Sequence, residues 1–286
     1  MTTPARVAFQ GELGAYSEEA IRNLDARAIP IPCREFIDVA QAVEGGDADA
    51  GMLPIENTLA GSVVGSYDAL TACPSLHVVA ETVVDIHHCV LAPRGASLDA
   101  LTAIESHPVA LAQCTRWLRA RPAIAARAAY DTAGAARDVA QQGNPRAAAI
   151  AGRAAAERYD LQVLAANIED RSDNQTRFLM VARSPRALER GTRARTALLL
   201  TTPNVPGALL RVLEPLAANG INMSKLESRP ADEPWHYRFF LELDHAASDP
   251  ALSAALEQVR SVTESQRVLG TYSRWLAGRT SGPSPD

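Results

Sequence analysis

The sequence predicts an α/β fold in two parts: a two-lobed domain, followed by a smaller module with the ferredoxin-like strand order. Two observations predict it. Over roughly the first 183 residues, short apolar strands alternate with alanine-rich helices, as in α/β proteins with mostly parallel sheets. After a polar segment the order changes to βαββαβ, which is the ferredoxin-like order. A length of 286 residues is enough for two such domains.

The first part contains more predicted elements than one small sheet accommodates. Two long strands in the middle are therefore expected to cross between two lobes, with a cleft between the lobes. The predicted strands are Arg6–Gln10, Ala28–Pro32, Ala50–Pro54, His77–Val83, His88–Ala92, Ala103–Glu105, Ala125–Tyr130, Ala147–Ile150 and Phe178–Ala182. The predicted helices are Tyr16–Leu24, Ile37–Glu44, Val63–Thr71, Pro108–Arg119, Thr132–Gln141 and Gly152–Tyr159.

The second part begins after a polar, basic linker at residues 184–193. Pro206 fits the first turn of a helix, and Gly220 is typical of the position just after a helix ends. The tail, residues 278–286, is rich in glycine, serine and proline and is expected to be flexible. The predicted strands are Thr196–Thr201, Ile221–Ser228, Trp235–Leu243 and Glu264–Trp275, with a turn at Arg229–Pro234 and helices at Gly207–Asn219 and Pro250–Val259.

The composition excludes several classes of protein. The formal net charge is −5 and neither part has a basic stripe, so a nucleic-acid partner is not expected. No uncharged apolar run reaches about 18 residues, so no membrane span is expected. The N-terminus has no apolar leader, which favours a cytoplasmic protein. Four widely spaced cysteines are interpreted as buried thiols in a reducing cytosol, not as a zinc site or a disulfide framework: Cys33, Cys73, Cys89 and Cys114.

Lysine is nearly absent, since Lys225 is the one lysine among 28 basic residues. Chemistry that needs an active-site lysine, such as a P-loop or a Schiff base, is therefore excluded unless Lys225 performs it. An anionic substrate bound elsewhere must be held by arginine, histidine, hydroxyl or backbone N–H groups.

Two polar segments follow predicted strands of the first lobe. Gln10–Ser17 contains two glycines and opens a helix, which permits close approach of an anion, although a plain tight turn is an equal alternative. Leu53–Ser62 brings carboxylate, amide and hydroxyl groups to a strand end, where open α/β sheets bind ligands. The alternative for this second segment is helix capping by Asn57 or Thr58 with Glu56 in solvent.

Two further segments are candidates. Glu105–Pro108 ends a strand and starts a helix, so Ser106 or His107 caps that helix or contacts an anion. Asn174–Phe178 is the polar lead-in to a strand. In it, Thr176 is placed to hydrogen-bond a leaving oxygen and Arg177 to clamp a carboxylate, unless this is a surface loop with an ordinary ion pair.

Taken together, these segments resemble those of prephenate dehydratases, in order and over nearly the whole length. The resemblance is carried by Phe9–Gly11 with Gly14–Ala20, Pro54–Asn57 with Gly61–Val63, His88–Cys89, Ser106–Pro108 with Ala110–Cys114, Thr132–Ala136 and, most specifically, Asn174–Phe178. The second module resembles a regulatory ACT domain, through Gly207–Leu210 and Glu227–Pro230. No chorismate mutase domain is expected before position 1, so the resemblance is to the monofunctional form.

The resemblance implies a fold and an activity. It implies a periplasmic-binding-protein-like catalytic domain at 1–183, the linker at 184–193, an ACT domain at 194–277 and the tail at 278–286. The implied reaction is the decarboxylating dehydration of prephenate to phenylpyruvate, a carbon–oxygen lyase step in phenylalanine biosynthesis that needs no cofactor and no metal.

The resemblance also implies residue roles. Thr176 and Arg177 become the catalytic pair, and Glu56 is puzzling beside a dianion, which leaves its protonation open. The implied substrate-binding residues are Gly11, Ser17, Glu56, Asn57, Ser62, Ser106, Gln113 and Phe178. The implied phenylalanine-binding residues are Gly207, Ala208, Leu209, Leu210, Glu227, Ser228, Arg229 and Pro230. Phenylalanine would bind between the ACT modules of a homodimer, with pairing into a tetramer left open.

Three alternatives remain at this point. The same fold can act on arogenate, can carry a recruited activity such as hydrolysis of a small lactone, or can bind a small anion without catalysis. The sequence contains no G-x-S-x-G elbow and no His-rich metal motif that would favour a hydrolase.

Overall fold

The computed structural model describes residues 3–231 and 233–275, which divide into two compact units. The first unit contains residues 3–74 and Thr82–Leu179, and the second contains Ser75–Glu81 and the described residues from Met180 onward. Two strands therefore have residues in both units, β5 (His77–Asp85) and β11 (Gln175–Ala182). Among the helices of the described residues, none has the length and apolar character needed to cross a bilayer.

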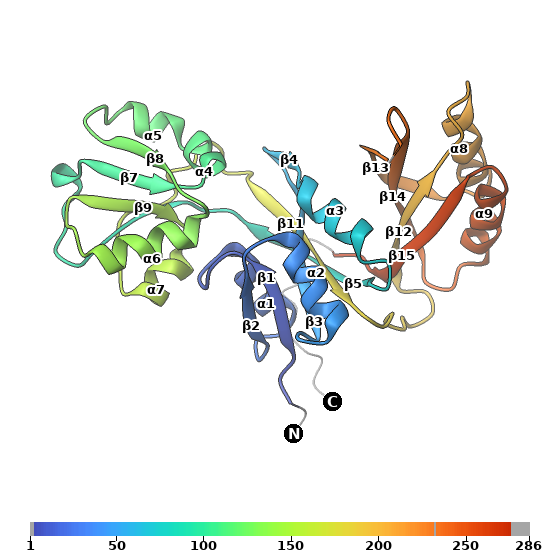
Figure 1. The fold of residues 1–286 in the computed structure, drawn as a ribbon, viewed down its shortest axis with the longest axis horizontal. Helices are drawn as coiled ribbons and strands as arrows, with labels where there is room; N and C mark the ends of the chain where they lie inside the picture. The colour runs from blue at the N-terminus through green and yellow to red at the C-terminus, as the bar shows by residue number, and fades with distance from the viewer. Residues whose placement is uncertain (1–2, 232, 276–286) are drawn as a thin grey trace. The chain divides into compact units, whose positions relative to one another are not determined.

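The first lobe of the first unit is built on a sheet with the strand order β2-β1-β3-β11-β5, and a short β4 pairs with β3 (Figure 1). β1 runs parallel to both β2 and β3. Helices α2 and α3 contact each other, and α1 packs on β1 and β3. The remaining elements of this lobe are β1 (Arg6–Gln10), β2 (Ile29–Cys33), β3 (Ala50–Asn57), β4 (Gly61–Ser62), α1 (Tyr16–Leu24), α2 (Phe36–Gly45) and α3 (Val64–Ala72).

The second lobe has a sheet with the order β10-β6-β9-β7-β8. β7 is parallel to β8 and β9, whereas β6 is antiparallel to β9 and β10. The sheet is mixed, not uniformly parallel, because β6, by which the chain enters the lobe, runs antiparallel to β9, and β10, by which it leaves, runs antiparallel to β6. Its elements are β6 (Cys89–Ala92), η1 (Leu98–Ala100), β7 (Ala103–Ser106), α4 (Pro108–Gln113), α5 (Thr115–Arg119), β8 (Ala125–Ala128), α6 (Thr132–Gln142), β9 (Ala147–Ala151), α7 (Arg153–Tyr159) and β10 (Gln162–Ala165).

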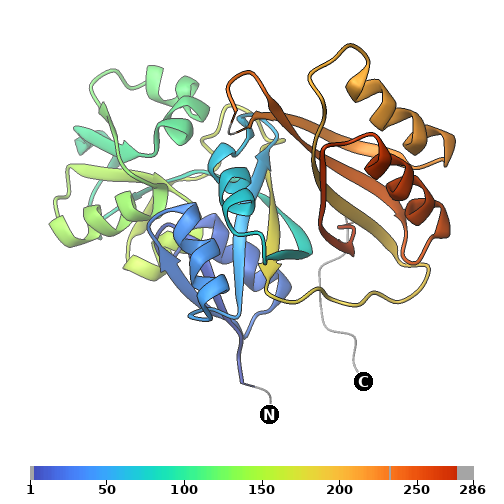
Figure 2. The same cartoon turned by 45° about the vertical axis from the view of Figure 1, so that its right-hand side comes forward.

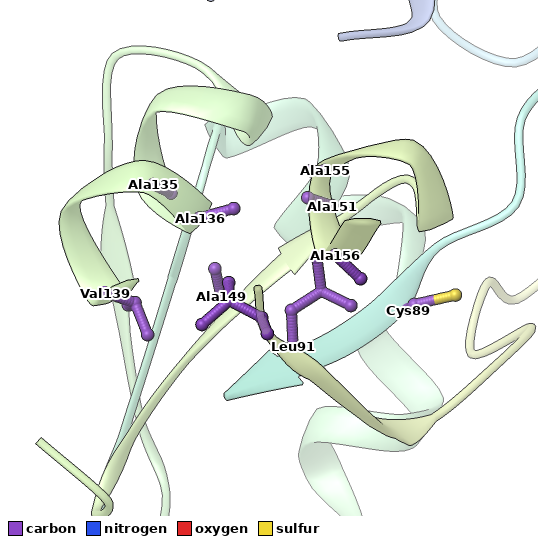
Figure 3. Close-up of a cluster of buried hydrophobic side chains, with 10 residues drawn as sticks. Cys89, Leu91, Ala135, Ala136, Val139, Ala149, Ala151, Ala155 and Ala156 are labelled. Atoms are coloured by element: carbon purple, nitrogen blue, oxygen red, sulfur yellow. The ribbon is translucent and has the colours of Figure 1, made fainter. Parts of the chain in front are cut away.

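Small side chains let the helices of the second lobe approach its sheet closely. Every residue of β9, whose sequence is AAAIA, is buried. Because side chains alternate across a strand, Ala149 and Ala151 pack on one face with α6 and α7, while Ala148 and Ile150 pack on the other with α4. Figure 3 shows the first of these clusters, in which Leu91, Val139 and Leu161 are the larger members. The alanine excess of the sequence is used here for close packing as well as for helix propensity.

Two crossing segments join the lobes, one between β5 and β6 and the other between β10 and β11. They hydrogen-bond each other through the backbone: Ile86 N–H donates to Asn174 C=O (2.8 Å), and Ile168 N–H donates to His88 C=O (3.1 Å). Polar side chains on these segments, His88 and Asn174 among them, are thereby held between the two lobes.

The second unit contains a sheet with the order β13-β14-β12-β15, all antiparallel, and two helices that cover one face (Figures 1 and 2). Leu198, Leu200, Leu241 and Leu243 pack against Val212 and other side chains of the helices in one core. This is the predicted βαββαβ order. Its elements are β12 (Arg193–Thr201), α8 (Ala208–Ala218), β13 (Asn222–Pro230), β14 (Tyr237–Ala246), α9 (Pro250–Ser261) and β15 (Ser265–Ser273).

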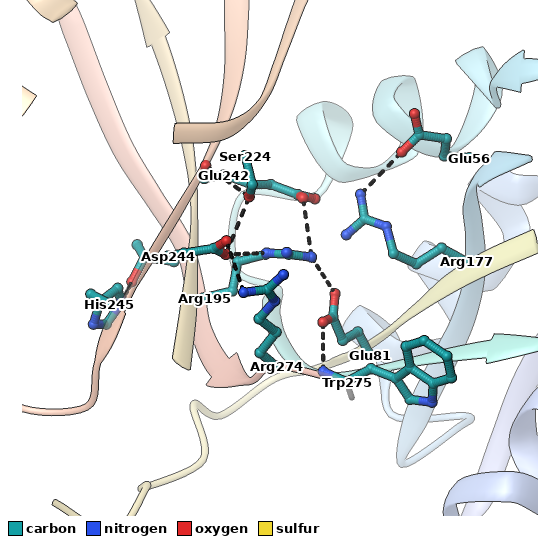
Figure 4. A network of polar contacts seen from close by, with 11 residues as sticks. Glu56, Glu81, Arg177, Arg195, Ser224, Glu242, Asp244, His245, Arg274 and Trp275 are labelled. Carbon is teal, nitrogen blue, oxygen red and sulfur yellow. Dashed lines mark hydrogen bonds and ion pairs between the residues drawn. The ribbon is translucent and has the colours of Figure 1, made fainter. Parts of the chain in front are cut away.

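A buried ion cluster lies on the other face of this sheet (Figure 4). Its centre is Arg195, whose guanidinium lies 3.0 Å from Glu81, 3.6 Å from Glu242 and 2.8 Å from Asp244. Glu81 also accepts a hydrogen bond from the Trp275 N–H at 2.7 Å. The N-terminal half of β5 is thus fixed to the second unit by charge.

Several elements differ from the sequence-based prediction. The single helix predicted over Pro108–Arg119 is two helices, because the chain breaks at Cys114 and the Asp170 carboxylate accepts from the N–H groups of Thr115 and Arg116. β4, η1 and β10 were not predicted. The predicted domain ranges 1–183 and 194–277 stay predictions, although the structure groups residues 75–81 and 180–183 with the second unit. The flexible tail predicted at 278–286 lies outside the described residues.

Candidate active site

A cavity of about 890 Å³ lies in the first unit and is lined by residues of both lobes and of the crossing segments. Five helices have residues of their N-terminal turns in its lining: α1, α2, α3, α4 and α6. Of the predicted site residues, those that line it are Gly11, Ser17, Asn57, Ser62, Gln113, Thr176 and Phe178. Segments more than 160 residues apart in the sequence meet here, which supports the predicted cleft between lobes.

Thr176 and Phe178 face the cavity from β11, one strand period apart. The Thr176 side chain is held by Asn57, whose Nδ2 donates to Thr176 Oγ1 at 2.9 Å and to Asn174 Oδ1 at 2.8 Å. Because the hydroxyl oxygen of Thr176 accepts from Asn57, its own proton is left to donate to a ligand in the cavity. Asn57 is fixed in turn, since its Oδ1 accepts from the N–H groups of Leu59 and Ala60.

Gln113 connects this pair to the crossing segments. Its Oε1 accepts from Asn174 Nδ2 at 3.0 Å and lies 2.9 Å from His88 Nε2, and its Nε2 donates to Asn57 Oδ1 at 3.4 Å. The side-chain network therefore runs from His88 through Gln113 and Asn57 to Thr176. Such a connected network fixes the direction in which each donor points.

His88 is the buried end of the network, with 2% of its surface exposed. Burial lowers the pKa of His88. Since Gln113 Oε1 is an acceptor, His88 Nε2 carries the proton. The Tyr16 hydroxyl donates its one proton to the His87 carbonyl at 2.8 Å and lies 3.1 Å from His88 Nδ1. Burial also raises the pKa of Tyr16 well above its ordinary value, so both side chains are neutral hydrogen-bonding groups.

Anion-binding groups line the cavity although lysine is absent from it. Helices α1 and α3 begin there without a side-chain cap, so their first-turn N–H groups face the cavity. Ser17 and Ser62 add hydroxyl groups at the starts of these helices, and Arg34 is the arginine among the lining residues. Gly11 has φ +108°, a value that favours glycine, and it keeps the backbone close to the cavity.

The expected position of Arg177 is wrong. Thr176 and Arg177 were predicted to face one substrate as a pair, but consecutive residues of a strand point to opposite faces. Arg177 Nη2 instead lies 3.4 Å from Glu56 Oε2 (Figure 4), and neither residue lines the cavity. The ion pair also accounts for Glu56, whose side chain pairs with Arg177 and does not line the cavity.

Ser106 is also not where the sequence analysis expected it. Its side chain is fully buried, and its hydroxyl donates to the Ile150 carbonyl at 2.6 Å between neighbouring strands. The next residue, His107, lines the cavity instead and caps α4 through its Nδ1, which accepts from the Val109 N–H. Ser106 is a structural residue, because the alternation of side chains along β7 turns its hydroxyl toward the neighbouring strand and away from the cavity.

Sequence reasoning missed several residues of the cavity wall. Tyr16, His88 and Thr132 stood inside stretches that carried the family resemblance, but they were given no role. His107 was predicted to cap a helix or to contact an anion, and it both caps α4 and lines the cavity. Asp131 was missed, because its place in the cavity wall follows from the fold and not from a local pattern. The signal that existed was position: Tyr16, His107 and Asp131 each lie at or beside a helix start.

The eight residues predicted to bind phenylalanine lie in the second unit. Gly207 is the N-cap of α8 with φ +78°, and Leu210 in the first turn is 58% exposed. Glu227, Ser228, Arg229 and Pro230 end β13, an edge strand that contacts α8. An exposed apolar side chain thus lies next to a glycine at which an added Cβ would meet only the Arg211 guanidinium, at 3.3 Å.

Two families match this sequence. The family described as "Prephenate dehydratase" matches residues 7–186, and the family described as "ACT domain" matches residues 196–261. Together they account for most of the described chain, in the order that the sequence predicted.

Curated relatives bear names of the same kind. "Arogenate dehydratase/prephenate dehydratase 2, chloroplastic" of Arabidopsis thaliana is 36% identical over 277 residues, which cover 93% of this chain and 72% of that protein. "Bifunctional chorismate mutase/prephenate dehydratase" of Enterobacter agglomerans is 35% identical over 273 residues, with 94% and 70% covered. "Arogenate dehydratase 2" of Petunia hybrida is 37% identical over 282 residues, with 93% and 71% covered.

Two solved structures are similar over nearly the whole chain. A structure described as "GqqA- a novel type of quorum quenching acylases" has a TM-score of 0.88 and 34% identity, with 96% of this chain and 100% of that chain covered. A prephenate dehydratase from Arthrobacter aurescens in complex with L-Phe has a TM-score of 0.87 and 32% identity, with 94% and 90% covered.

Proposed function

Because the chain belongs to the prephenate dehydratase family, we propose that it converts prephenate to phenylpyruvate, carbon dioxide and water. In this reaction the bond between the ring and its carboxylate breaks and the electron pair enters the ring. The ring hydroxyl leaves on the opposite side and takes up a proton to become water. Aromatisation supplies the driving force, so the protein has to assist the departing hydroxide and hold the two carboxylates.

The hydroxyl of Thr176 is the group best placed to assist the leaving oxygen, and this observation carries the proposal. Asn57 occupies one lone pair of its oxygen, which orients the O–H proton toward the cavity. A fixed donor aimed at an oxygen on which charge develops is the main device of electrostatic catalysis. Thr176 stabilises the departing oxygen by hydrogen bonding, and water supplies the proton.

The carboxylates of the substrate are held by helix starts and hydroxyls. One carboxylate is bound by the uncapped first turns of α1 and α3, together with the hydroxyl groups of Ser17 and Ser62. Arg34 lines the cavity and is the cation available to the substrate there. Phe178, which is 2% exposed, packs behind the ring. In this proposal Arg177 acts indirectly: with Glu56 it holds the reverse face of β11, on which Thr176 is mounted.

Replacing Thr176 tests the proposal. Thr176→Ala should lower kcat for prephenate at least about a hundredfold, because a positioned donor contributes about 10² to 10⁴ in rate. Formation of phenylpyruvate is followed by its ultraviolet absorbance. Thr176→Ser is the matched control, since it keeps the hydroxyl and should keep most of the activity. A loss of only about threefold in Thr176→Ala, with the fold intact, contradicts the proposed role.

We also propose that phenylalanine regulates the enzyme by binding to the second unit at Gly207–Leu210 and Glu227–Pro230, between the ACT modules of a homodimer. The relative from Arthrobacter aurescens, which was solved with L-Phe, supports this proposal.

The four free thiols support a reducing compartment, and we propose that the protein is located in the cytoplasm.

A second candidate is hydrolysis of an acyl amide, in which water splits the C–N bond into an acid and an amine. The structural similarity to a protein described as an acylase favours it. The lining residues Phe36, Ile37, Ala69 and Ala72 offer apolar contacts for an acyl chain. Incubation with an N-acyl amide and detection of the free amine tests this candidate on the same preparations, and absence of release by the wild type would reject it.

A further inference from the structure

Asp131 has one carboxylate oxygen that the protein leaves without a partner inside the cavity wall. As the N-cap of α6 it accepts a hydrogen bond from the Gly134 N–H through Oδ1. Its other oxygen, Oδ2, is buried and has no hydrogen-bond partner. Asp131 lines the cavity and faces the turn at Gly11, where an added Cβ would lie 3.7 Å from Oδ2. A buried carboxylate oxygen without a donor is costly, which suggests that a ligand supplies the donor.

No neighbouring cation satisfies this oxygen among the described side chains. Arg137 directs its guanidinium to Glu12 and Asp138. His107 faces Asp131, but burial lowers the pKa of His107, so the ring is neutral at physiological pH. Glu12 adds a further negative charge nearby. Burial raises the pKa of Asp131, which is the expected response of a carboxylate whose charge lacks a counterpart.

The charges of the cavity wall also favour a ligand that carries a positive group. Arg34 is the one arginine among the lining residues, against the carboxylates of Glu35, Asp68 and Asp131. Prephenate brings two carboxylates and a keto oxygen, and no hydrogen-bond donor for Asp131 on its side chain. Arogenate, the form named by several relatives, has an ammonium group in place of the keto oxygen. An ammonium supplies three donors and a positive charge at this position.

We propose that Asp131 is a specificity-determining residue that binds the ammonium group of arogenate and disfavours the keto oxygen of prephenate. This proposal rests on the proposed dehydratase function and names the preferred substrate form. The amine takes no part in bond breaking, so the contact acts on substrate recognition. The same carboxylate has two functions: Oδ1 caps the N-terminus of α6, and Oδ2 binds the ammonium group.

The test is Asp131→Asn, assayed with both substrates. Asparagine caps helices as well as aspartate does, so α6 is kept while the charge is removed. Wild type should show the higher kcat/KM with arogenate. In Asp131→Asn, kcat/KM for arogenate should fall by about tenfold to a hundredfold, as expected for loss of a charge-assisted hydrogen bond. The value for prephenate should stay or rise, because the new Nδ2 group can donate to a keto oxygen.

A matched control is Asp249→Asn, which changes the N-cap aspartate of α9 in the second unit and should alter neither value. An equal fall of kcat/KM for both substrates in Asp131→Asn, or a wild type that prefers prephenate, overturns the role of Asp131 and leaves the dehydratase function standing. If wild type consumes neither substrate, the dehydratase function fails, and the proposal that rests on it fails too.

Discussion

At the scale of single residues, the charge state of His88 is decided by burial. The ring is enclosed between Tyr16 and Gln113, and it is neutral because a charged imidazole there would lose its hydration. The hydrogen-bond network that reaches Thr176 therefore begins at an uncharged histidine.

This burial predicts a pH dependence of stability. The folded-state pKa of His88 lies below its ordinary value of 6.5, so the unfolded chain takes up the proton first as the pH falls. The stability that His88 contributes is complete above about pH 6.5 and is lost as the pH falls toward the lower, folded-state pKa. The variant His88→Gln lacks this titration, so its stability deficit against wild type should shrink between about pH 7.5 and about pH 5.5. Urea unfolding at several pH values measures the deficit, and a constant deficit would contradict the prediction.

The sequence identified Thr176, Asn57 and Gln113 as site residues, but it could not orient Arg177. The predicted strand began at Phe178, whereas β11 begins at Gln175. With the earlier start, strand alternation alone places Thr176 and Phe178 on one face and Arg177 on the other. Asp131 and His88 were beyond local reasoning, because what makes them functional is contact with residues from distant parts of the chain.

At the scale of elements, the turn between β1 and α1 is shaped by glycine. Gly14 has φ +87°, and a Cβ added there would lie 2.9 Å from the Cα of Ala155 in α7. The turn thus brings the first lobe against a helix of the second with no space for a side chain. The motif in the sequence predicted close approach to a ligand, and the structure adds a close approach between elements.

Gly14→Ala should therefore destabilise the protein by about 2 to 4 kcal/mol, from left-handed backbone strain and from overpacking. Gly143→Ala is the matched control: φ is +62° there, but nothing lies within 4 Å of the added Cβ, so only the strain of about 1 kcal/mol is expected. Chemical denaturation of both variants separates the two contributions. Equal losses of stability would show that the contact with α7 costs nothing.

At the scale of the whole molecule, two strands are shared by the units. β11 carries Thr176 in the first unit and continues into the second. β5 begins in the second unit and continues into the first, and the ion-paired Glu81 is its last residue in the second unit. A change of the second unit on the proposed binding of phenylalanine would thereby be connected, through continuous backbone, to strands of the sheet that holds Thr176. Coupling of this kind is reciprocal.

Phenylalanine and a substrate analogue should therefore weaken each other's binding by the same factor, about 5-fold to 150-fold. In Glu81→Gln this factor should approach one while each ligand still binds, because Arg195 keeps Glu242 and Asp244 as partners and the second unit stays folded. Glu257→Gln, an exposed change on α9, is the control and should leave the factor unchanged. Isothermal titration of the full chain with each ligand, alone and in the presence of the other, measures it. If the factor in Glu81→Gln equals that of wild type, the anchoring of β5 by charge plays no part in regulation.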